Sequence, residues 1–316
     1  MLSEALKLKI KLTSSIRKHQ ASGMLLSGGL DSAILAALAP ERIKAITVSL
    51  KQLGQDRKYA RSLVRGLRIK HYQQTVTMQQ AIKSIPEVIK VLKTFDPAIP
   101  NDLVVYFGLR KARELGIKQL ITGDGSDELL AGYSFMQKVD DLAGYIRRIT
   151  KKMQFSSNRL GAFFGIKIIQ PFLDRQLINF ALKIDPQFKI KRQGQQIWGK
   201  WILRKAFEEI LPAEIIWQDK RPLESGSGMS RLRDIIAAKV KDSEFKRHRY
   251  PVKLMNKEHF YYYRVYREVI GRIPQAKKAE LSCPGCGAGI ARPAFHCYTC
   301  GTCGTCGTCG WAKPLK

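Results

Sequence analysis

"SGGLDS", residues 27–32, is the stretch that decides how the fold is read. The apolar residues before it (23–26) predict a short buried strand, and "AILAALA" (33–39) predicts a helix after it. Glycines at a strand–loop–helix junction let the backbone approach a ligand, and the helix N-terminus favours a phosphate group. Asp31 suits a phosphate that carries Mg²⁺. The loop lacks the Gly-Lys-Ser/Thr ending of the common nucleotide loop, and an ordinary turn with a capping Asp or Ser is the alternative.

Strand and helix patterns alternate along the chain after this loop. Residues 43–50 predict a strand, residues 60–76 a helix followed by a strand, and residues 109–133 a helix, a strand and a second glycine-rich acidic loop, "TGDGSDELLAGY". This alternation predicts an α/β fold with an open, mostly parallel sheet and helices on both faces. Ligands in such sheets bind outside the carboxyl ends of the strands, so we expect both loops to open on one edge.

The length and charge of the chain limit its class. The 316 residues suffice for one large domain and a small module. No apolar run approaches the roughly 20 residues of a membrane span, so we expect no membrane partner. Residues 1–20 lack the apolar core of a signal peptide, so we expect them to form a helix of the fold and the protein to be cytoplasmic. The net charge of +29, with basic runs at 145–152 and 245–253, favours tRNA or another RNA as partner, or reflects a generally basic surface.

The cysteines gather in one short segment near the end of the chain. All seven lie between residues 283 and 309, which indicates a separate metal-binding tail in a reducing compartment. Four follow the pattern C-x₂-C-x₁₀-C-x₂-C of a structural zinc ribbon, namely Cys283, Cys286, Cys297 and Cys300. His296 is an alternative ligand. A triplet repeat adds Cys303, Cys306 and Cys309, which either bind metal or belong to a low-complexity expansion, the interpretation that we favour.

Composition divides the chain into three parts. We expect a main domain over 1–271 with a helical C-terminal part, a polar linker over 272–280, and a small zinc-ribbon-like tail with the repeat over 281–311. The tail is typical of docking on nucleic acid or on other proteins. The aromatic, basic stretch 259–270 is either a stacking surface for RNA bases or an amphipathic helix that packs on the main domain; we favour the helix.

Four motifs together carry a family resemblance. "SGGLDS" and "TGDGSDELLAGY", with "QPFLDRQLINFALKIDP" (170–186) and "KWILRKAFEEILPAEIIWQDKRPLESGSG" (200–228), resemble the synthetase domain of asparagine synthetases over roughly the first 235 residues. The resemblance implies an adenine nucleotide alpha-hydrolase-like (PP-loop) fold. It implies that a carboxylate attacks the α-phosphate of ATP, and that a nitrogen nucleophile then displaces AMP to form an amide. Such relatives include β-lactam-forming synthetases and lasso-peptide cyclases, so the chemistry is better specified than the substrate.

The resemblance also implies residues that bind ATP and Mg²⁺. The first loop would bind diphosphate through Ser27, Gly28, Gly29, Asp31 and Ser32. Asp31 and Asp127 would share Mg²⁺, because two carboxylates would converge on it from the two loops. Gly123 would lie close to the nucleotide, and the end of the second strand, at Val48, would frame the adenine through backbone groups.

Three further residues carry implied roles with open alternatives. Asp124 would orient or deprotonate the nucleophile, or cap its loop. Lys220 would stabilise negative charge on the α-phosphate and on the later oxyanion, or be a solvated surface lysine. Asp174, in "PFLD", is either functional or a helix cap.

Departures from the family pattern bear on the substrates. The ATP loop follows Met1 too closely for an N-terminal glutaminase domain, so we expect nitrogen from free ammonia, from an amine on the substrate or from a separate amidotransferase subunit. The family's Thr-Thr-x-Arg stretch is replaced by "DPAIPND" (96–102), and its Glu-x-Arg by Lys167, Ile168 and Ile169, before Gln170. The missing arginines argue against aspartate as substrate, although Lys167 is a candidate replacement cation.

Three functions remain open on the sequence. The first is an amide ligase that acts on a carboxylate-bearing small molecule or peptide. The second is a ligase or thiolase that acts on tRNA, which the charge and the ribbon favour. The third is a non-catalytic nucleotide-binding adaptor, which the presence of Asp31, Asp127 and Lys220 together argues against. The motifs at 170–186 and 200–228 favour the amide ligase.

Overall fold

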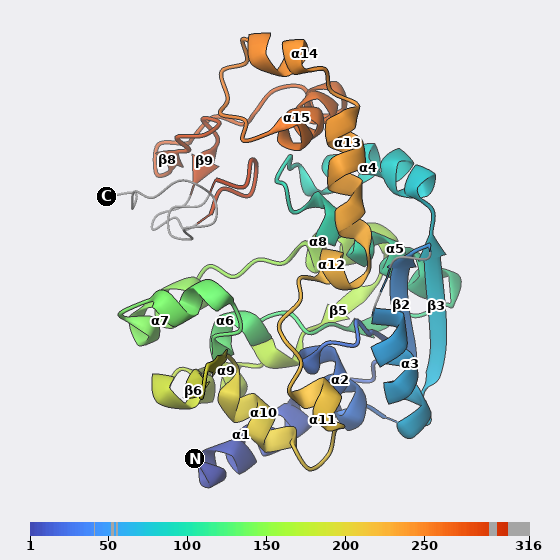
Figure 1. Ribbon diagram of the computed structural model, residues 1–316, viewed down its shortest axis with the longest axis vertical. Helices are drawn as coiled ribbons and strands as arrows, with labels where there is room; N and C mark the ends of the chain where they lie inside the picture. The colour runs from blue at the N-terminus through green and yellow to red at the C-terminus, as the bar shows by residue number, and fades with distance from the viewer. Residues whose placement is uncertain (41, 52–53, 55, 291–295, 303–316) are drawn as a thin grey trace.

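A five-stranded parallel sheet forms the centre of the protein (Figure 1). The computed structural model describes residues 1–40, 42–51, 54, 56–290 and 296–302. The strands lie in the order β3-β2-β1-β4-β5, and every neighbouring pair is parallel. Their bounds are β1 (Gly23–Leu25), β2 (Lys44–Leu50), β3 (Lys70–Val76), β4 (Gln119–Ile121) and β5 (Lys167–Ile169). The predicted α/β fold with an open parallel sheet is confirmed.

Helices cover both faces of the sheet, because the inner strands β1, β2 and β4 are largely buried on both sides. The helices on one face form the first layer, with its own hydrophobic core: α1 (Leu2–Arg17), α2 (Leu30–Leu38), α3 (Asp56–Gly66), α9 (Arg175–Ala181), α10 (Trp201–Phe207) and α11 (Ala213–Ile216). The helices on the other face form the second layer and core: α4 (Met78–Leu92), α5 (Ile99–Glu114), α8 (Ser156–Phe164), α13 (Leu232–Ala238) and α15 (Lys257–Val269). Successive side chains of β2 alternate between the layers: Ala45 packs in the first core and Ile46 in the second. The helix expected over residues 1–20 is present as α1.

Short elements complete the chain and shape the edge of the sheet. They are α6 (Ser126–Leu130), α7 (Leu142–Thr150), α12 (Leu223–Gly226), α14 (Asp242–Arg247), the 3₁₀ turns Ser134–Lys138, Pro171–Leu173, Pro186–Phe188 and Met229–Arg231, and the hairpins β6 (Lys191–Gln193)–β7 (Gln196–Trp198) and β8 (Leu281–Ser282)–β9 (Gly289–Ile290). Within the described ranges, no helix is both long and apolar enough to cross a bilayer.

The strand order places a topological switch point between β1 and β4. From β1 the chain runs outward through β2 and β3, then returns to the other side of β1 with β4 and β5. The loops that leave β1 and β4 therefore diverge at the carboxyl edge, where open α/β sheets bind their ligands. Both glycine loops lie at this point, as the sequence predicted.

The stretch 259–270 folds as the amphipathic helix that we favoured. In α15 the side chains of Phe260, Tyr262, Tyr263 and Tyr266 are buried. The ring centroids of Tyr263 and Tyr266 lie 4.9 and 5.2 Å from that of Phe95, at the end of α4. These aromatic side chains form part of the core, so they are not an exposed stacking surface.

Candidate active site

A cavity of about 650 Å³ opens at the carboxyl edge of β1, β2 and β4. Both glycine loops line it, together with residues 195–200 and the segment 218–223. One wall is apolar: Leu25 and Val48 come from the sheet, and Val104 and Val105 from α5. A cavity of this size, with an apolar wall and polar loops, suits a nucleotide and a small second substrate.

The first loop is held in shape by its own serines. Ser32 Oγ accepts a hydrogen bond from the Ser27 amide at 3.2 Å and donates to the Gly29 carbonyl at 3.1 Å. Gly28 has φ of +72°, and a Cβ there would lie 2.9 Å from the Cβ of Tyr59, so this position needs glycine. The turn leads directly into α2, whose first residues, Leu30 and Asp31, line the cavity.

The second loop contacts the first. A Cβ on Gly123 would lie 3.2 Å from the Cβ of Asp31, so glycine allows the two loops to approach. The hydroxyl of Ser126, at the start of α6, donates to Asp31 Oδ1 at 2.7 Å. The expectation that Gly123 and Asp31 belong to one site matches their placement.

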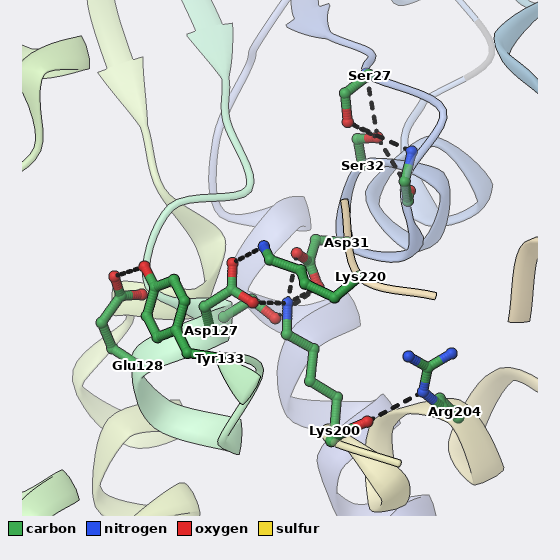
Figure 2. Close-up of polar contacts among 12 residues, drawn as sticks. Ser27, Asp31, Ser32, Asp127, Glu128, Tyr133, Lys200, Arg204 and Lys220 are labelled. Atoms are coloured by element: carbon green, nitrogen blue, oxygen red, sulfur yellow. Dashed lines mark hydrogen bonds and ion pairs between the residues drawn. The ribbon is translucent and has the colours of Figure 1, made fainter. Parts of the chain in front are cut away.

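Two carboxylates and two ammonium groups meet where the loops converge (Figure 2). Lys200 Nζ lies 2.6 Å from Asp31 Oδ2 and 2.7 Å from Asp127 Oδ1. Lys220 Nζ lies 2.5 Å from Asp127 Oδ2. Burial raises the pKa of Asp127, but Lys200 and Lys220 outweigh it and hold the pKa at about 2. Asp127 is therefore ionised at neutral pH.

Lys200 is the residue that sequence reasoning missed. Its side chain is 5% exposed, and its ammonium bridges carboxylates from both loops. Burial lowers the pKa of Lys200, but Asp127 and Asp31 outweigh it and raise the pKa. The backbone of Lys200 is left-handed, with φ of +56°, and the preceding Gly199 packs so close to the Ala131 carbonyl that a Cβ would lie 2.4 Å from it. The sequence did contain one signal for this role, because Lys200 is the first residue of the motif at 200–228 that carries the family resemblance.

Asp124 is fastened by neutral donors. Its Oδ2 accepts hydrogen bonds from Thr122 Oγ1 at 2.7 Å, Ser157 Oγ at 2.6 Å and Gln170 Nε2 at 2.9 Å. The carboxylate still lines the cavity. These contacts fix its orientation, so they fit both the proposed orienting role and the loop-stabilising alternative.

The segment that carries Lys220 covers the first loop. Gln218 Nε2 donates to the Gly28 carbonyl at 3.1 Å, and the Arg221 guanidinium lies 4.5 Å from the ring centroid of Tyr59. Lys220 itself is 38% exposed and faces the Tyr133 ring at 5.5 Å. The lysine is thus anchored by its neighbours while its ammonium borders the cavity.

Two candidates for a role in the site lie elsewhere. Lys167 begins β5 with an exposed side chain and does not line the cavity, so the structure does not bring it to the substrate. Asp174 caps α9: its Oδ1 accepts from the amides of Gln176 at 2.9 Å and Leu177 at 3.4 Å. The helix-cap interpretation of Asp174 is confirmed.

The first four cysteines form a second, separate cluster. The sulfur atoms of Cys283, Cys286, Cys297 and Cys300 lie within 4.8 Å of one another, and all four residues are buried. His296 is not part of the cluster, and its Nε2 lies 2.7 Å from Asp96 Oδ2. Cys303, Cys306 and Cys309 lie outside the described residues.

Comparison with known proteins points to one family. The asparagine synthase family model matches residues 7–157 and 144–277. A probable glutamine-hydrolyzing asparagine synthetase from Dictyostelium discoideum is 32% identical over 259 residues, 71% of this chain and 46% of that protein. The glutamine-hydrolyzing asparagine synthetase B of Escherichia coli K12 is 28% identical over 318 residues, 90% of this chain and 57% of that protein. The chain therefore spans about half the length of these curated relatives.

Among solved structures, the chain is similar to an NH₃-dependent NAD synthetase from Campylobacter jejuni. The TM-score is 0.28 and the sequence identity 15%, over 67% of this chain and 96% of that one. A likeness this low carries no argument about function.

Proposed function

The chain belongs to the asparagine synthase family, and on that premise we propose that it is a carbon–nitrogen ligase that forms AMP and diphosphate. A carboxylate of the substrate is adenylated at the α-phosphate of ATP, and a nitrogen nucleophile then displaces AMP to leave an amide. The observation that carries this proposal is the convergence of both glycine loops, Asp31, Asp127, Lys200 and Lys220 at one edge of the sheet.

The first loop and the start of α2 would hold the leaving diphosphate. The loop offers backbone N–H groups, the Ser27 and Ser32 hydroxyls and the positive end of the helix. The apolar wall at Leu25 and Val48 would receive the adenine. Because the loop is already closed on itself by its serines, little reorganisation is needed when the phosphates bind.

Asp31 and Asp127 fit a Mg²⁺ ion carried by ATP. Their carboxylates approach a common point from two loops, where they already balance a cation, the ammonium of Lys200. Carboxylate oxygens are the ligands that Mg²⁺ prefers. When bound, the ion supplies positive charge that offsets the charge on the diphosphate.

The two lysines and Asp124 would act on the reacting groups. Lys220 is the more exposed lysine and has a single carboxylate partner, so its ammonium can turn to the α-phosphate and stabilise charge that develops there. Lys200 bridges Asp31 and Asp127 in the structure and so links the two loops. Asp124, oriented by Ser157 and Gln170, would direct the nucleophile.

The nitrogen nucleophile that we propose is ammonia, free or passed from a separate amidotransferase subunit, or an amine of the substrate. The curated relatives are named glutamine-hydrolyzing. Among the described residues that line the cavity, none is a cysteine. The acyl substrate is a small carboxylate or peptide other than aspartate, because the segments that would carry carboxylate-binding arginines read "DPAIPND" and "KIIQ".

We propose that the four-cysteine cluster binds one structural Zn²⁺. Four sulfur ligands on two C-x₂-C turns match the donor set that zinc prefers, and a closed set of four leaves no open position for catalysis. The four cysteines do not line the ATP cavity, so the ion would not contact the reacting groups.

One observation favours RNA as a second candidate substrate. Both basic runs of the sequence contact the cysteine-bearing tail: Tyr298 Oη donates to the Lys152 carbonyl at 2.9 Å, and the Lys253 amide donates to the Gly285 carbonyl at 2.7 Å. Basic segments next to a zinc-ribbon-like tail suit a phosphate backbone. The presence of both carboxylates and both lysines in one cluster argues against the third function, a non-catalytic nucleotide-binding adaptor.

Release of AMP and diphosphate from ATP–Mg²⁺ tests the proposal. The purified protein is assayed with ammonium and a panel of amino-acid carboxylates, aspartate included, and in parallel with bulk tRNA. We expect turnover with a small carboxylate and none with tRNA alone. Turnover with tRNA alone would favour the second candidate, and asparagine formation would contradict the argument against aspartate.

A further inference from the structure

We propose that the zinc-bound tail positions the substrate side of the active site by fixing residues 94–102 and, through Asn101, the segment after Lys220. The tail is called the ribbon below and comprises the described residues 281–290 and 296–302. The inference rests on the proposed function only in that it treats the Lys220 segment as part of a ligase site. The contacts themselves are independent of the reaction.

The ribbon bonds directly to the start of the 94–102 segment. The Thr299 carbonyl accepts from the Phe95 amide at 2.7 Å and from Thr94 Oγ1 at 3.3 Å. The His296 ring lies 2.7 Å from Asp96 Oδ2, and the other oxygen of Asp96 accepts from the Ala98 amide at 2.8 Å. The ribbon therefore holds the backbone at Phe95 and the side chain of Asp96, just before α5 begins.

Burial shows that this contact is part of the protein's core. The four cysteines are between 1 and 7% exposed and belong to the same hydrophobic core as Phe95. That core also contains Tyr263 and Tyr266 of α15. Figure 1 shows β8 and β9 beside α15, at the end of the molecule where α4 and α13 also lie. The ribbon is docked on its own chain, on the segment that stands in place of the family's Thr-Thr-x-Arg stretch.

The second half of the connection runs from α5 to the Lys220 segment. Asn101 Oδ1 accepts from the Glu224 amide at 2.8 Å, at the start of α12. The Glu224 carboxylate pairs with Arg233 at 2.7 Å, and Arg233 pairs with Glu258 of α15 at 2.9 Å. Residues 218–223, immediately before Glu224, line the cavity. Asn101 is thus the link between a segment held by the ribbon and one that covers the ATP loop.

Zinc is needed because the ribbon has little structure without it. Its strands are two residues each, and its buried side chains are chiefly the cysteines themselves. A module of that size cannot bury enough apolar surface to stay ordered, so metal binding supplies its folding free energy. Loss of the ion should release Thr299 and His296 from the 94–102 segment.

Hydrogen exchange on the full chain tests the inference without any substrate. The protein is compared with bound Zn²⁺, after removal by a chelator, and after Zn²⁺ is restored. We expect one zinc per chain, and exchange of the Phe95 and Glu224 amides at least about tenfold faster without it. Exchange confined to the ribbon, or a protein that binds no zinc, would overturn the proposal.

Two variants separate positioning from general loss of structure. His296→Ala keeps all four cysteines and should still bind one zinc, yet should speed exchange over residues 96–101 and at Glu224. Asn101→Ala should make the Glu224 amide insensitive to zinc while Phe95 still responds. Tyr298→Phe is the matched control, because it removes a ribbon contact to Lys152 and none to residues 94–102. Unchanged exchange at Glu224 in His296→Ala would also overturn the proposal.

Kinetics give a second readout once a carboxylate substrate is known. His296→Ala should raise the KM for the carboxylate by about tenfold and leave that for ATP within about twofold, because the ribbon does not contact the ATP loops. The exchange experiment needs no turnover. A chain that shows the exchange response but forms no AMP would refute the ligase and leave the positioning role standing.

Discussion

Lys200 and Lys220 look alike in the sequence and differ in their surroundings. The Lys200 side chain is 5% exposed and contacts two carboxylates, whereas Lys220 is 38% exposed and contacts one. Moving the buried Lys200 ammonium away from the two carboxylates is costly, because buried charges would be left without a partner. The exposed lysine can exchange its partner for a phosphate at small cost.

Replacing Lys220 tests this distinction. In Lys220→Ala we expect the rate of AMP formation to fall by about 10²–10³, the loss typical of one preorganised donor to a developing charge. ATP–Mg²⁺ affinity should change little, because Lys220 is assigned to charge that develops during the reaction. The melting temperature should change little, because the side chain is partly exposed and its partner Asp127 keeps Lys200. Lys239→Ala, at an exposed lysine outside the cavity, is the control. Equal AMP formation by both variants would contradict the assigned role.

Asp102, at the start of α5, should make stability depend on pH. Burial, opposed by a hydrogen bond from Ser156, raises the pKa of this carboxyl to about 7. Its stabilising contribution is complete below the unfolded-state pKa and is lost as the pH rises to about 7, where the folded protein must ionise a buried group.

The Asp102→Asn variant isolates that contribution. The free energy of unfolding of the wild type should fall between about pH 4 and pH 7, by an amount on the order of a few kcal/mol. Asp102→Asn should fall less, by the share of Asp102 alone, because burial also raises the pKa values of Asp56 and Glu128 to about 7. Denaturant unfolding at several pH values measures both. Asp234→Asn, at an exposed position of α13, is the control and should follow the wild type. An equal decline in the wild type and in Asp102→Asn would reject this source of pH dependence.

At the scale of single residues, the sequence predicted the loop chemistry and missed a long-range contact. Ser27, Gly28 and Asp31 are neighbours in the chain, so their pattern alone indicates a phosphate loop. Lys200 meets Asp31 across 169 residues, and nothing local marks which lysine of a very basic chain will be buried there. The contact between His296 and Asp96 spans 200 residues, so the sequence did not indicate this partner of His296 either.

At the scale of elements, Asp174 should matter for stability and not for chemistry. It accepts two amides at the start of α9 and pairs with Lys18 at 2.6 Å. Asp174→Ala should lower the free energy of unfolding by about 1 kcal/mol, the usual cost of a lost N-cap, with AMP formation unchanged. Asp174→Asn keeps the cap and should recover most of that loss in denaturant unfolding. A large loss of activity in Asp174→Asn would revive the functional interpretation.

The elements themselves were largely foreseeable because their signals are local. The strand pattern at 43–50 became β2, and the pattern at 60–76 became α3 and β3. For the aromatic, basic stretch 259–270, the packed amphipathic helix that we favoured over a stacking surface is what the structure contains. The sequence could not predict the surface on which α15 and the ribbon pack, because this surface depends on tertiary contacts between α4, α5 and residues far along the chain.

At the scale of the whole molecule, the ribbon is expected to contribute to overall stability. Since its cysteines share a core with α15 and Phe95, removal of zinc should lower the melting temperature by about 5 °C or more, and Zn²⁺ but not Mg²⁺ should restore it. Differential scanning calorimetry of the full chain measures this. A melting temperature unaffected by chelation would indicate that the four cysteines do not hold a stabilising ion.

The most direct test of the account is to follow the carboxylate oxygen. The protein is incubated with ATP–Mg²⁺, ammonium and the active carboxylate labelled with ¹⁸O, and the nucleotide product is analysed by mass spectrometry. The account predicts equal amounts of AMP and diphosphate, with one ¹⁸O transferred to AMP, because the carboxylate attacks the α-phosphate and its oxygen leaves with AMP. ADP and phosphate as products, or AMP without the label, would contradict it.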